Sequence, residues 1–407
     1  MKKSTRGCKV FSVAFISLVL LLISCRKNSG QPTESTTIDL SAYSTQSIES
    51  VIESVSAVDF KIDDSWIYLN TSIMTKTENS YAFLDEENGV LQIYDVDGHK
   101  KMSRSLFGRG SGEILNVGHI YTIGDTVCIY DDSMGNLLYY DEDGNYIGKW
   151  EVSVIDNYLY KISNDNKYIG LYTSRDDGNE YVYIYNKNGE IANKHLSVPN
   201  YLKGKNISFG RTPNSYLFND TLRFILPYDY NIYSVTESSL TTTYSYVPKN
   251  PIPKSILKEA EENTTIEIHG TVMAGGYDFM FHNIFETNRY LLFTYHSDKT
   301  FEICLFDKIN SSLNKMPFPE KFYNKSMASS LTTYDIWQYL IYNISPLYSD
   351  GESIYGRTFI QTYEMLKDCE DKLDERLLSL KNNLEEYIKA NDITLGDAII
   401  VKISLSR

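Results

Sequence analysis

The chain has 407 residues, of which 42% are hydrophobic and 23% charged, so it is neither disordered nor wholly embedded in a membrane. It has 39 Lys and Arg against 53 Asp and Glu, giving a formal charge of −14. That balance argues against a nucleic acid partner, because phosphates need clustered cations. The 34 Tyr and 17 Phe favour β-strands, and the length suits two or three domains or one large all-β domain.

The first 24 residues have the parts of a bacterial export signal. Four basic residues precede a mostly apolar run, 10–23, which is shorter than the roughly 20 residues of a spanning helix. The run ends in LISC, which resembles the lipobox of bacterial lipoproteins, and in that family the peptidase cuts before a cysteine that carries lipid. The alternative is an ordinary secretory signal that contains a cysteine.

The lipobox resemblance implies a signal peptide over 1–24 and lipid on Cys25, with a flexible tether over 25–37. We therefore expect a protein of the cell envelope, held by its lipid at the outer membrane of a Gram-negative bacterium. An acidic protein would be repelled by anionic headgroups, so acyl chains and not basic patches would provide the anchor.

Three cysteines remain beyond the lipobox, an odd number for an oxidising compartment. Cys128 and Cys304 lie in apolar, strand-like runs, which predicts buried free thiols. No CxxC pair exists, so the sequence supports neither a redox motif nor a cysteine zinc site.

A strand–turn–strand pattern recurs along the chain with a period typical of propeller blades. It is clearest in 81–106, 127–150 and 168–196, whose second-turn glycines, Gly98, Gly144 and Gly189, are 46 and 45 residues apart. Degenerate copies follow at 222–246 and 290–316, and a sixth hairpin is expected at 346–356. The pattern predicts an all-β, six-bladed β-propeller over 38–407.

The turns of the repeat are chemically suited to positive φ. Asp-Gly at 97–98 and 143–144, between alternating strands, is the ordinary hairpin signal. The acidic residues beside these glycines allow a calcium site as an alternative, but neither turn continues to the spaced glutamate of an EF-hand. We interpret them as turns.

The link between the first two repeats, FGRGSGEILNVGHI (107–120), carries a family resemblance. It resembles the glycine-rich link of NHL-like propellers, and more closely the GRGxGE link of TolB-like six-bladed propeller lipoproteins. The residues concerned are Gly108, Arg109, Gly110, Gly112 and Glu113. The resemblance implies a six-bladed propeller and carries over no catalytic residue.

Two segments depart from the strand pattern. Residues 254–263 can form a short helix beside the fourth blade, and 362–391 carries apolar residues at helical spacing from Leu366 to Ile388. We expect the second segment to be a helical insertion packed on the propeller rim, the alternative being a coiled coil that binds a partner. The run AIIVKISL (398–405) follows and is predicted to be the strand that closes the ring.

Catalytic signatures are missing from the sequence. The six histidines form no HExxH pair, no GxSxG elbow is present, and the glycine-rich link lacks the GK[ST] ending of a phosphate loop. We therefore expect no catalytic residue, no metal site and no cofactor. The many tyrosines could line a sugar-binding surface, although half-buried strands account for them as well.

The sequence favours a non-catalytic binding or scaffolding module for a protein, peptide or glycan. The alternative is a propeller hydrolase or lactonase with a cation in its central channel, since propellers host both. If 114–121 is the innermost strand of its blade, Arg109 and Glu113 lie nearest the channel mouth and are the candidate binding residues. The competing interpretation makes them structural clamps between blades.

Overall fold

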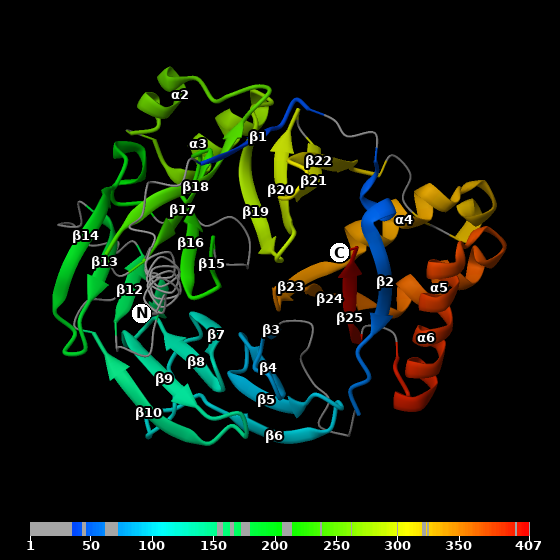
Figure 1. Cartoon of the computed structure of the whole chain (residues 1–407), viewed down its shortest axis with the longest axis horizontal. Coiled ribbons are helices and arrows are strands. Elements are labelled where there is room, and N and C mark those ends of the chain that lie inside the picture. The colour runs from blue at the N-terminus through cyan, green and yellow to red at the C-terminus, as the bar shows by residue number, and fades with distance from the viewer. Residues whose placement is uncertain are drawn as a thin grey trace, which may run out of the picture.

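The computed structural model describes residues 35–42, 46–61, 72–152, 158–162, 167–171, 180–205, 214–236, 238–261, 263–298, 300–319, 323, 325–394 and 397–406. The predicted signal peptide, Cys25 and residues 176–179 within the third predicted repeat, 168–196, lie outside these residues. Six β-sheets are arranged in a ring (Figure 1), and this confirms the six-bladed β-propeller.

Each blade is an antiparallel sheet whose first strand lies nearest the ring axis, and we number the blades 1 to 6 from β3 onward. The strands, grouped by blade, are β3 Ser72–Lys76, β4 Ser80–Asp85, β5 Val90–Asp95 and β6 Lys100–Ser105; β7 His119–Ile123, β8 Thr126–Asp131, β9 Asn136–Tyr140 and β10 Tyr146–Glu151; β11 Tyr158–Lys161, β12 Tyr168–Leu171, β13 Glu180–Tyr185 and β14 Ile191–Ser197; β15 Ser215–Phe218, β16 Thr221–Ile225, β17 Asn231–Val235 and β18 Leu240–Val247; β19 Phe279–Glu286, β20 Tyr290–Ser297, β21 Thr300–Asp307 and β22 Ser312–Pro317; and β23 Ser345–Ser349, β24 Ser353–Phe359, β25 Ala398–Leu405 and β2 Ile52–Ala57.

Blade 6 closes the ring by joining the two ends of the described chain. The predicted closing strand is β25, and its outer partner is β2, which pairs with it in antiparallel register with Val55 opposite Ile403. Both side chains are buried. Helix α6 (Glu375–Asn391) holds β2 from outside, because Arg376 Nη1 donates hydrogen bonds to the carbonyls of Glu49 at 2.6 Å and Ile52 at 2.7 Å.

A second N-terminal strand, β1 (Thr36–Asp39), lies on blade 4. It runs parallel to β18 as a fifth strand, starting two residues before the predicted propeller boundary at 38. The chain then passes to the short helix η1 (Ile48–Val51) and β2 in blade 6, and Lys315 of β22 donates a hydrogen bond to the Leu40 carbonyl on the way. The N-terminal segment thus ties together blades 4, 5 and 6.

The turns divide between two faces of the ring. Among the described residues, the turn face carries the turns between the first and second strands and between the third and fourth strands, including Gly98, Gly144 and Gly189, which have φ of 83°, 83° and 78° as predicted. A Cβ at Gly98 would lie 2.0 Å from the Asp59 carbonyl oxygen, so only glycine fits there. The link face carries the second turns and the connections between blades.

Helices interrupt the connections on the link face. The predicted insertion before β25 is helical but is not one helix, because it divides into α5 (Ile360–Asp368), the short η4 (Glu370–Lys372) and α6. The break has a local cause: the Asp374 side chain accepts a hydrogen bond from the Leu377 N–H at 2.9 Å and so starts a new helix. Leu366, Leu380 and Leu384 are buried against blade 6, as packing on the rim predicts.

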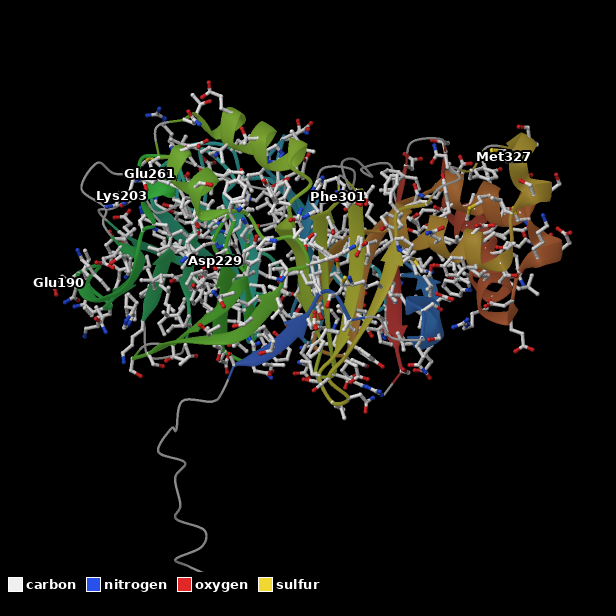
Figure 2. All side chains as sticks on the ribbon, turned by 90° about the horizontal axis from the view of Figure 1, so that it is seen from above. Glu190, Lys203, Asp229, Glu261, Phe301 and Met327 are labelled. Carbon is white, nitrogen blue, oxygen red and sulfur yellow. The ribbon has the colours of Figure 1, made fainter. Side chains whose placement is uncertain are left out.

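Three further helices have weaker sequence signals. The segment predicted at 254–263 forms α2 (Lys254–Glu259), and α3 (Thr265–Ala274) and α4 (Thr333–Asn343) were not predicted. Both unpredicted helices begin with a capping box, at Thr264 with Glu267 and at Thr332 with Asp335. With the ring seen edge-on, Lys203, Glu261, Phe301 and Met327 lie toward one side of the molecule (Figure 2).

Buried apolar side chains fill most of the space between neighbouring blades. Cys128, Cys304 and Cys369 are buried free thiols, which confirms the prediction for the first two. Burial raises the pKa of Cys128 to about 12, so this thiol stays protonated and unreactive at neutral pH. In the described part of the chain, no helix has both the length and the apolar character needed to cross a membrane.

Candidate functional site

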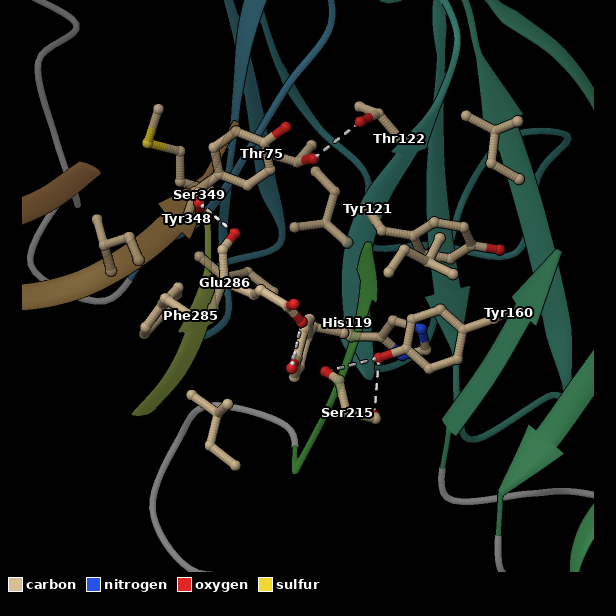
Figure 3. Close-up of a pocket in the computed structure, with 18 of the residues that line it drawn as sticks. Thr75, His119, Tyr121, Thr122, Tyr160, Ser215, Phe285, Glu286, Tyr348 and Ser349 are labelled. Atoms are coloured by element: carbon tan, nitrogen blue, oxygen red, sulfur yellow. Dashed lines mark hydrogen bonds between the residues drawn. The ribbon is translucent and has the colours of Figure 1, made fainter. Parts of the chain in front are cut away.

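The main cavity of about 430 Å³ lies on the ring axis and is walled by the innermost strands of all six blades (Figure 3). Its lining includes Asn219 and Asp220 of the β15–β16 turn, so it extends toward the turn face. Apolar and aromatic side chains make up much of the wall, with Thr75, Thr122, Ser215 and Ser349 among them. This volume is that of a site for a small ligand or for one end of a larger one.

Most hydroxyl groups of the wall are committed to neighbouring blades. Tyr160 Oη lies 2.9 Å from Ser215 Oγ, Ser349 Oγ donates to the Glu286 carbonyl at 2.8 Å, and Thr122 Oγ1 donates to the Lys76 carbonyl at 3.0 Å. These bonds fix the positions of the inner strands relative to one another. The wall is therefore preorganised before any ligand enters.

His119, at the start of β7, is the exception among these polar groups. Its residue is 2% exposed, and both ring nitrogens are buried without a well-formed hydrogen bond in the described part of the chain, although the nearby Leu159 backbone opposes the fall of the pKa of this ring. The ring stacks on Tyr121 with centroids 5.5 Å apart and contacts Tyr160 at 4.6 Å. Burial lowers the pKa of His119 to about 3, so the imidazole is neutral at pH 7 and can both donate and accept a hydrogen bond.

A buried charge cluster supports the wall between blades 4 and 5. The Glu286 side chain is fully buried and pairs with Arg223 Nη1 and Lys308 Nζ, each at 2.9 Å. Its oxygens also accept hydrogen bonds from Tyr216 at 3.0 Å and Tyr244 at 2.9 Å. With two cations to one carboxylate, the cluster has a formal charge of +1 beside the cavity of an acidic protein.

The predicted candidates Arg109 and Glu113 lie elsewhere. Neither lines the central cavity; both line a smaller hollow of about 260 Å³ with Tyr146 and Lys149 of the outermost strand β10. The expectation that they flank the channel mouth is wrong, because the innermost strand starts at His119 and not at Ile114. Ile114 instead forms an isolated bridge with Phe107, which folds the link back over the outer part of the blades.

The link is a tight turn closed by its own glutamate and held to blade 2 by Tyr140, whose hydroxyl donates to the Gly112 carbonyl at 2.8 Å. Glu113 Oε2 accepts a hydrogen bond from the Gly110 N–H at 2.6 Å, and a Cβ at Gly108 would lie 2.0 Å from this oxygen. The glycines therefore let the chain close around the Glu113 carboxylate. This bond supports a structural role for Glu113.

The described residues offer little for metal or nucleophilic chemistry. Among them, no three His, Cys, Asp or Glu side chains come together as they would around a metal ion. Asp95 Oδ1, a candidate for calcium in the sequence, accepts hydrogen bonds from the N–H groups of Asp97 and His99 within its own turn. The Asp-Gly segments therefore act as turns in which the first aspartate satisfies the backbone.

Sequence reasoning missed His119, Glu286 and Arg223 as residues of the site. Only His119 carried a usable signal, since it starts the strand that follows the glycine-rich link. Glu286 meets Arg223 and Lys308 only because blades 4 and 5 are neighbours. No local pattern reveals such a pairing.

Comparisons with known proteins agree with this architecture. The DUF5128 family, described as a 6-bladed β-propeller, matches residues 26–346. A Bacteroides fragilis protein of solved structure, described as exported, aligns with a TM-score of 0.71 at 14% identity, over 91% of this chain and 99% of its own. This likeness shows the shared fold.

Two other solved structures align less well. A Bacteroides vulgatus protein of the DUF4221 family has a TM-score of 0.47 at 10% identity, over 88% of this chain and 97% of its own. An inactive virginiamycin B lyase from Staphylococcus aureus has a TM-score of 0.40 at 11% identity, over 86% and 99%. No curated protein sequence matches the chain.

Replacing Glu286 with Gln should destabilise the propeller strongly. The change leaves Arg223 and Lys308 buried without a counter-charge, which costs about 3–5 kcal/mol when a buried pair is broken. Urea unfolding at pH 7 measures the loss. Glu78→Gln, at an exposed residue, is the control and should change the free energy of unfolding by less than about 0.5 kcal/mol. Equal effects of the two changes would contradict a structural role for the cluster.

Proposed function

Because the chain belongs to the DUF5128 family of six-bladed β-propellers, we propose that it is a non-catalytic binding protein of the cell envelope. Its central cavity receives the end of a peptide or glycan, carried by a larger partner or free. Tyrosine and phenylalanine rings of the wall offer surfaces for stacking, and backbone and side-chain polar groups set orientation.

The observation that carries this proposal is His119. A buried polar group without a partner is costly, and the cost is offset when a ligand supplies the missing hydrogen bond. The imidazole lines the central cavity. The hydroxyl groups of the cavity wall, in contrast, already form hydrogen bonds within the protein. We propose that the His119 ring, whose nitrogens are shielded within the cavity wall, turns to hydrogen-bond a ligand there.

The location forms a second part of the proposal. Lipid on Cys25 holds the protein at the outer membrane of a Gram-negative bacterium, an assignment supported by the lipobox and by the B. fragilis neighbour described as exported. Strand β1 pairs with the second half of β18 and runs toward the link face, so the chain enters blade 4 from the side of the turn face, toward which the cavity also extends. An anchored propeller would then turn its cavity toward the membrane that holds it.

The link motif keeps a place in the proposal. Its glycine pattern supports the TolB-like and NHL-like affinity of the chain. We propose that Arg109 and Glu113 take part in binding the partner on the link face. Glu113 shapes the turn that presents Arg109.

Replacing His119 with Phe should weaken ligand binding and spare the fold. The new ring can keep the stacking on Tyr121 and Tyr160 but has no nitrogen to bond, so affinity should fall by about tenfold, the worth of one buried hydrogen bond. A panel of peptides and oligosaccharides, screened by thermal shift and followed by calorimetry, supplies the ligand. His99→Phe, at an exposed turn residue, is the control. If a ligand binds both variants with the wild-type affinity, the proposal that ligands bind beside His119 in the central cavity is wrong.

Replacing Cys25 with Ala should move the protein from the membrane fraction to the soluble fraction. The lipid has no other attachment point in the lipobox interpretation, and the acidic chain has little affinity for anionic headgroups. Fractionation of cells that express either form measures the change. Retention of the Cys25→Ala variant in the membrane fraction would contradict the lipid anchor.

A further inference from the structure

A second cavity, of about 410 Å³, lies between blades 5 and 6, away from the axial site. We propose that it binds a single-chain amphiphile, a straight-chain fatty acid, with the hydrocarbon tail between the blades and the polar head toward the ring axis. This inference does not rest on the function proposed for the central cavity.

The lining changes from polar to apolar with distance from the axis. The innermost strands β19 and β23 contribute Pro346 and the polar side chains of His282, Asn283 and Ser345. His282 and Asn283 also interact with the protein itself, His282 through a ring contact with Phe301. The second and third strands contribute mainly aliphatic and aromatic side chains, and β2, on the outside, adds another aliphatic one. These residues are Leu292, Ile354, Phe359, Phe301, Ile303, Leu305, Ile403, Leu405 and Ile52. A head that needs hydrogen bonds and a tail that needs none match this order.

The polar side chains that lie away from the axis, those of Thr294, Tyr342 and Asn343, bond to the protein itself, and Asn343 Nδ2 donates to the Tyr339 carbonyl at 2.7 Å. Thr294 Oγ1 donates to the His282 carbonyl at 2.9 Å. Tyr342 of α4 donates to the Met316 carbonyl at 2.8 Å, and the Phe301 carbonyl oxygen lies 3.0 Å from the same hydroxyl. Their hydroxyls thus hold the wall and offer no competing bond, which leaves the interior suited to a hydrocarbon chain.

The backbone is distorted where the polar end lies. The register of β19 against β20 shifts on both sides of His282, and Asn283 has φ of 50°, a left-handed conformation that costs energy outside glycine. The other innermost strands hold no such double irregularity among the described residues. The distortion coincides with the gap between blades 5 and 6.

A hydrocarbon tail gains free energy from every methylene group that leaves water. Each added CH₂ should therefore tighten binding about fourfold until the cavity is full. Several walls enclose the tail: blade 5, blade 6, α4 and η1. Figure 1 shows β19 and β23 as neighbours on the inner side of the ring, which places the head beside the axis.

The test uses the full chain with Cys25→Ala, so that no acyl group of its own competes, purified without detergent. Octanoate, decanoate and dodecanoate are titrated by calorimetry. We expect affinity to rise about fourfold per CH₂ along the series. Ile303→Phe and, separately, Ile354→Phe fill the apolar part and should each weaken dodecanoate binding by about tenfold or more. Leu217→Phe narrows the central cavity instead and should leave dodecanoate binding unchanged.

Melting temperatures show whether each variant is folded. Two variants that fill the cavity are used so that the test still stands if one of them does not fold. Three results would overturn the proposal: no dodecanoate binding, affinity independent of chain length, or binding that both filling variants keep. Binding lost in Leu217→Phe alone would also overturn it, because the fatty acid would then occupy the central cavity.

Discussion

Closure of the ring is the constraint on which the rest of the structure depends. A blade is a small twisted sheet with two edges, and it is stable only when its faces are buried against neighbouring blades. The last blade takes three strands from the C-terminal part of the chain and its outermost strand, β2, from the N-terminal part. In the closed ring the first and last blades are neighbours, and Tyr348 Oη of β23 donates a hydrogen bond to the Lys76 carbonyl of β3 at 3.3 Å. The central cavity is thereby walled by all six blades.

The elements around blade 6 secure that pairing. Arg376 of α6 bonds the backbone at both ends of η1, and Asn383 of the same helix accepts a hydrogen bond from the Ala57 N–H at 2.5 Å. The α5–α6 insertion therefore packs on the closing blade and holds its outermost strand. The cavity between blades 5 and 6 lies beside this reinforced region, where a gap in packing can be tolerated.

A cluster of buried charged side chains lies between blades 4 and 5, away from the closing blade. Glu286, Arg223 and Lys308 come from two blades, and their pairing fixes the wall of the central cavity at a considerable cost of desolvation. Burial lowers the pKa of Lys308, although Glu286 opposes that change. Hydrogen bonds from Tyr216 and Tyr244 complete the shell around the carboxylate, so the rigidity of the wall comes from polar bonds as well as from packing.

The sequence predicted what depends on local chemistry. Glycines at Gly98, Gly144 and Gly189 marked the turns and the blade period, because their backbone conformation excludes most other residues. It did not predict α3 or α4, whose capping boxes are short signals among many Thr and Ser residues. It misplaced Arg109 and Glu113 because the link folds back over Leu106 before the inner strand begins. The site itself unites residues far apart in sequence, such as Tyr348 and Lys76, whose hydrogen bond at 3.3 Å joins blades 6 and 1 in the closed ring.

Amide hydrogen exchange of the full chain tests ring closure most directly. If β2 completes blade 6, the amides that bond it to β25 should exchange as slowly as those of central strands such as β8, through global unfolding. Rapid exchange of Ile52–Ala57 while the other blades stay protected would show that the ring is open at blade 6, and would contradict the account.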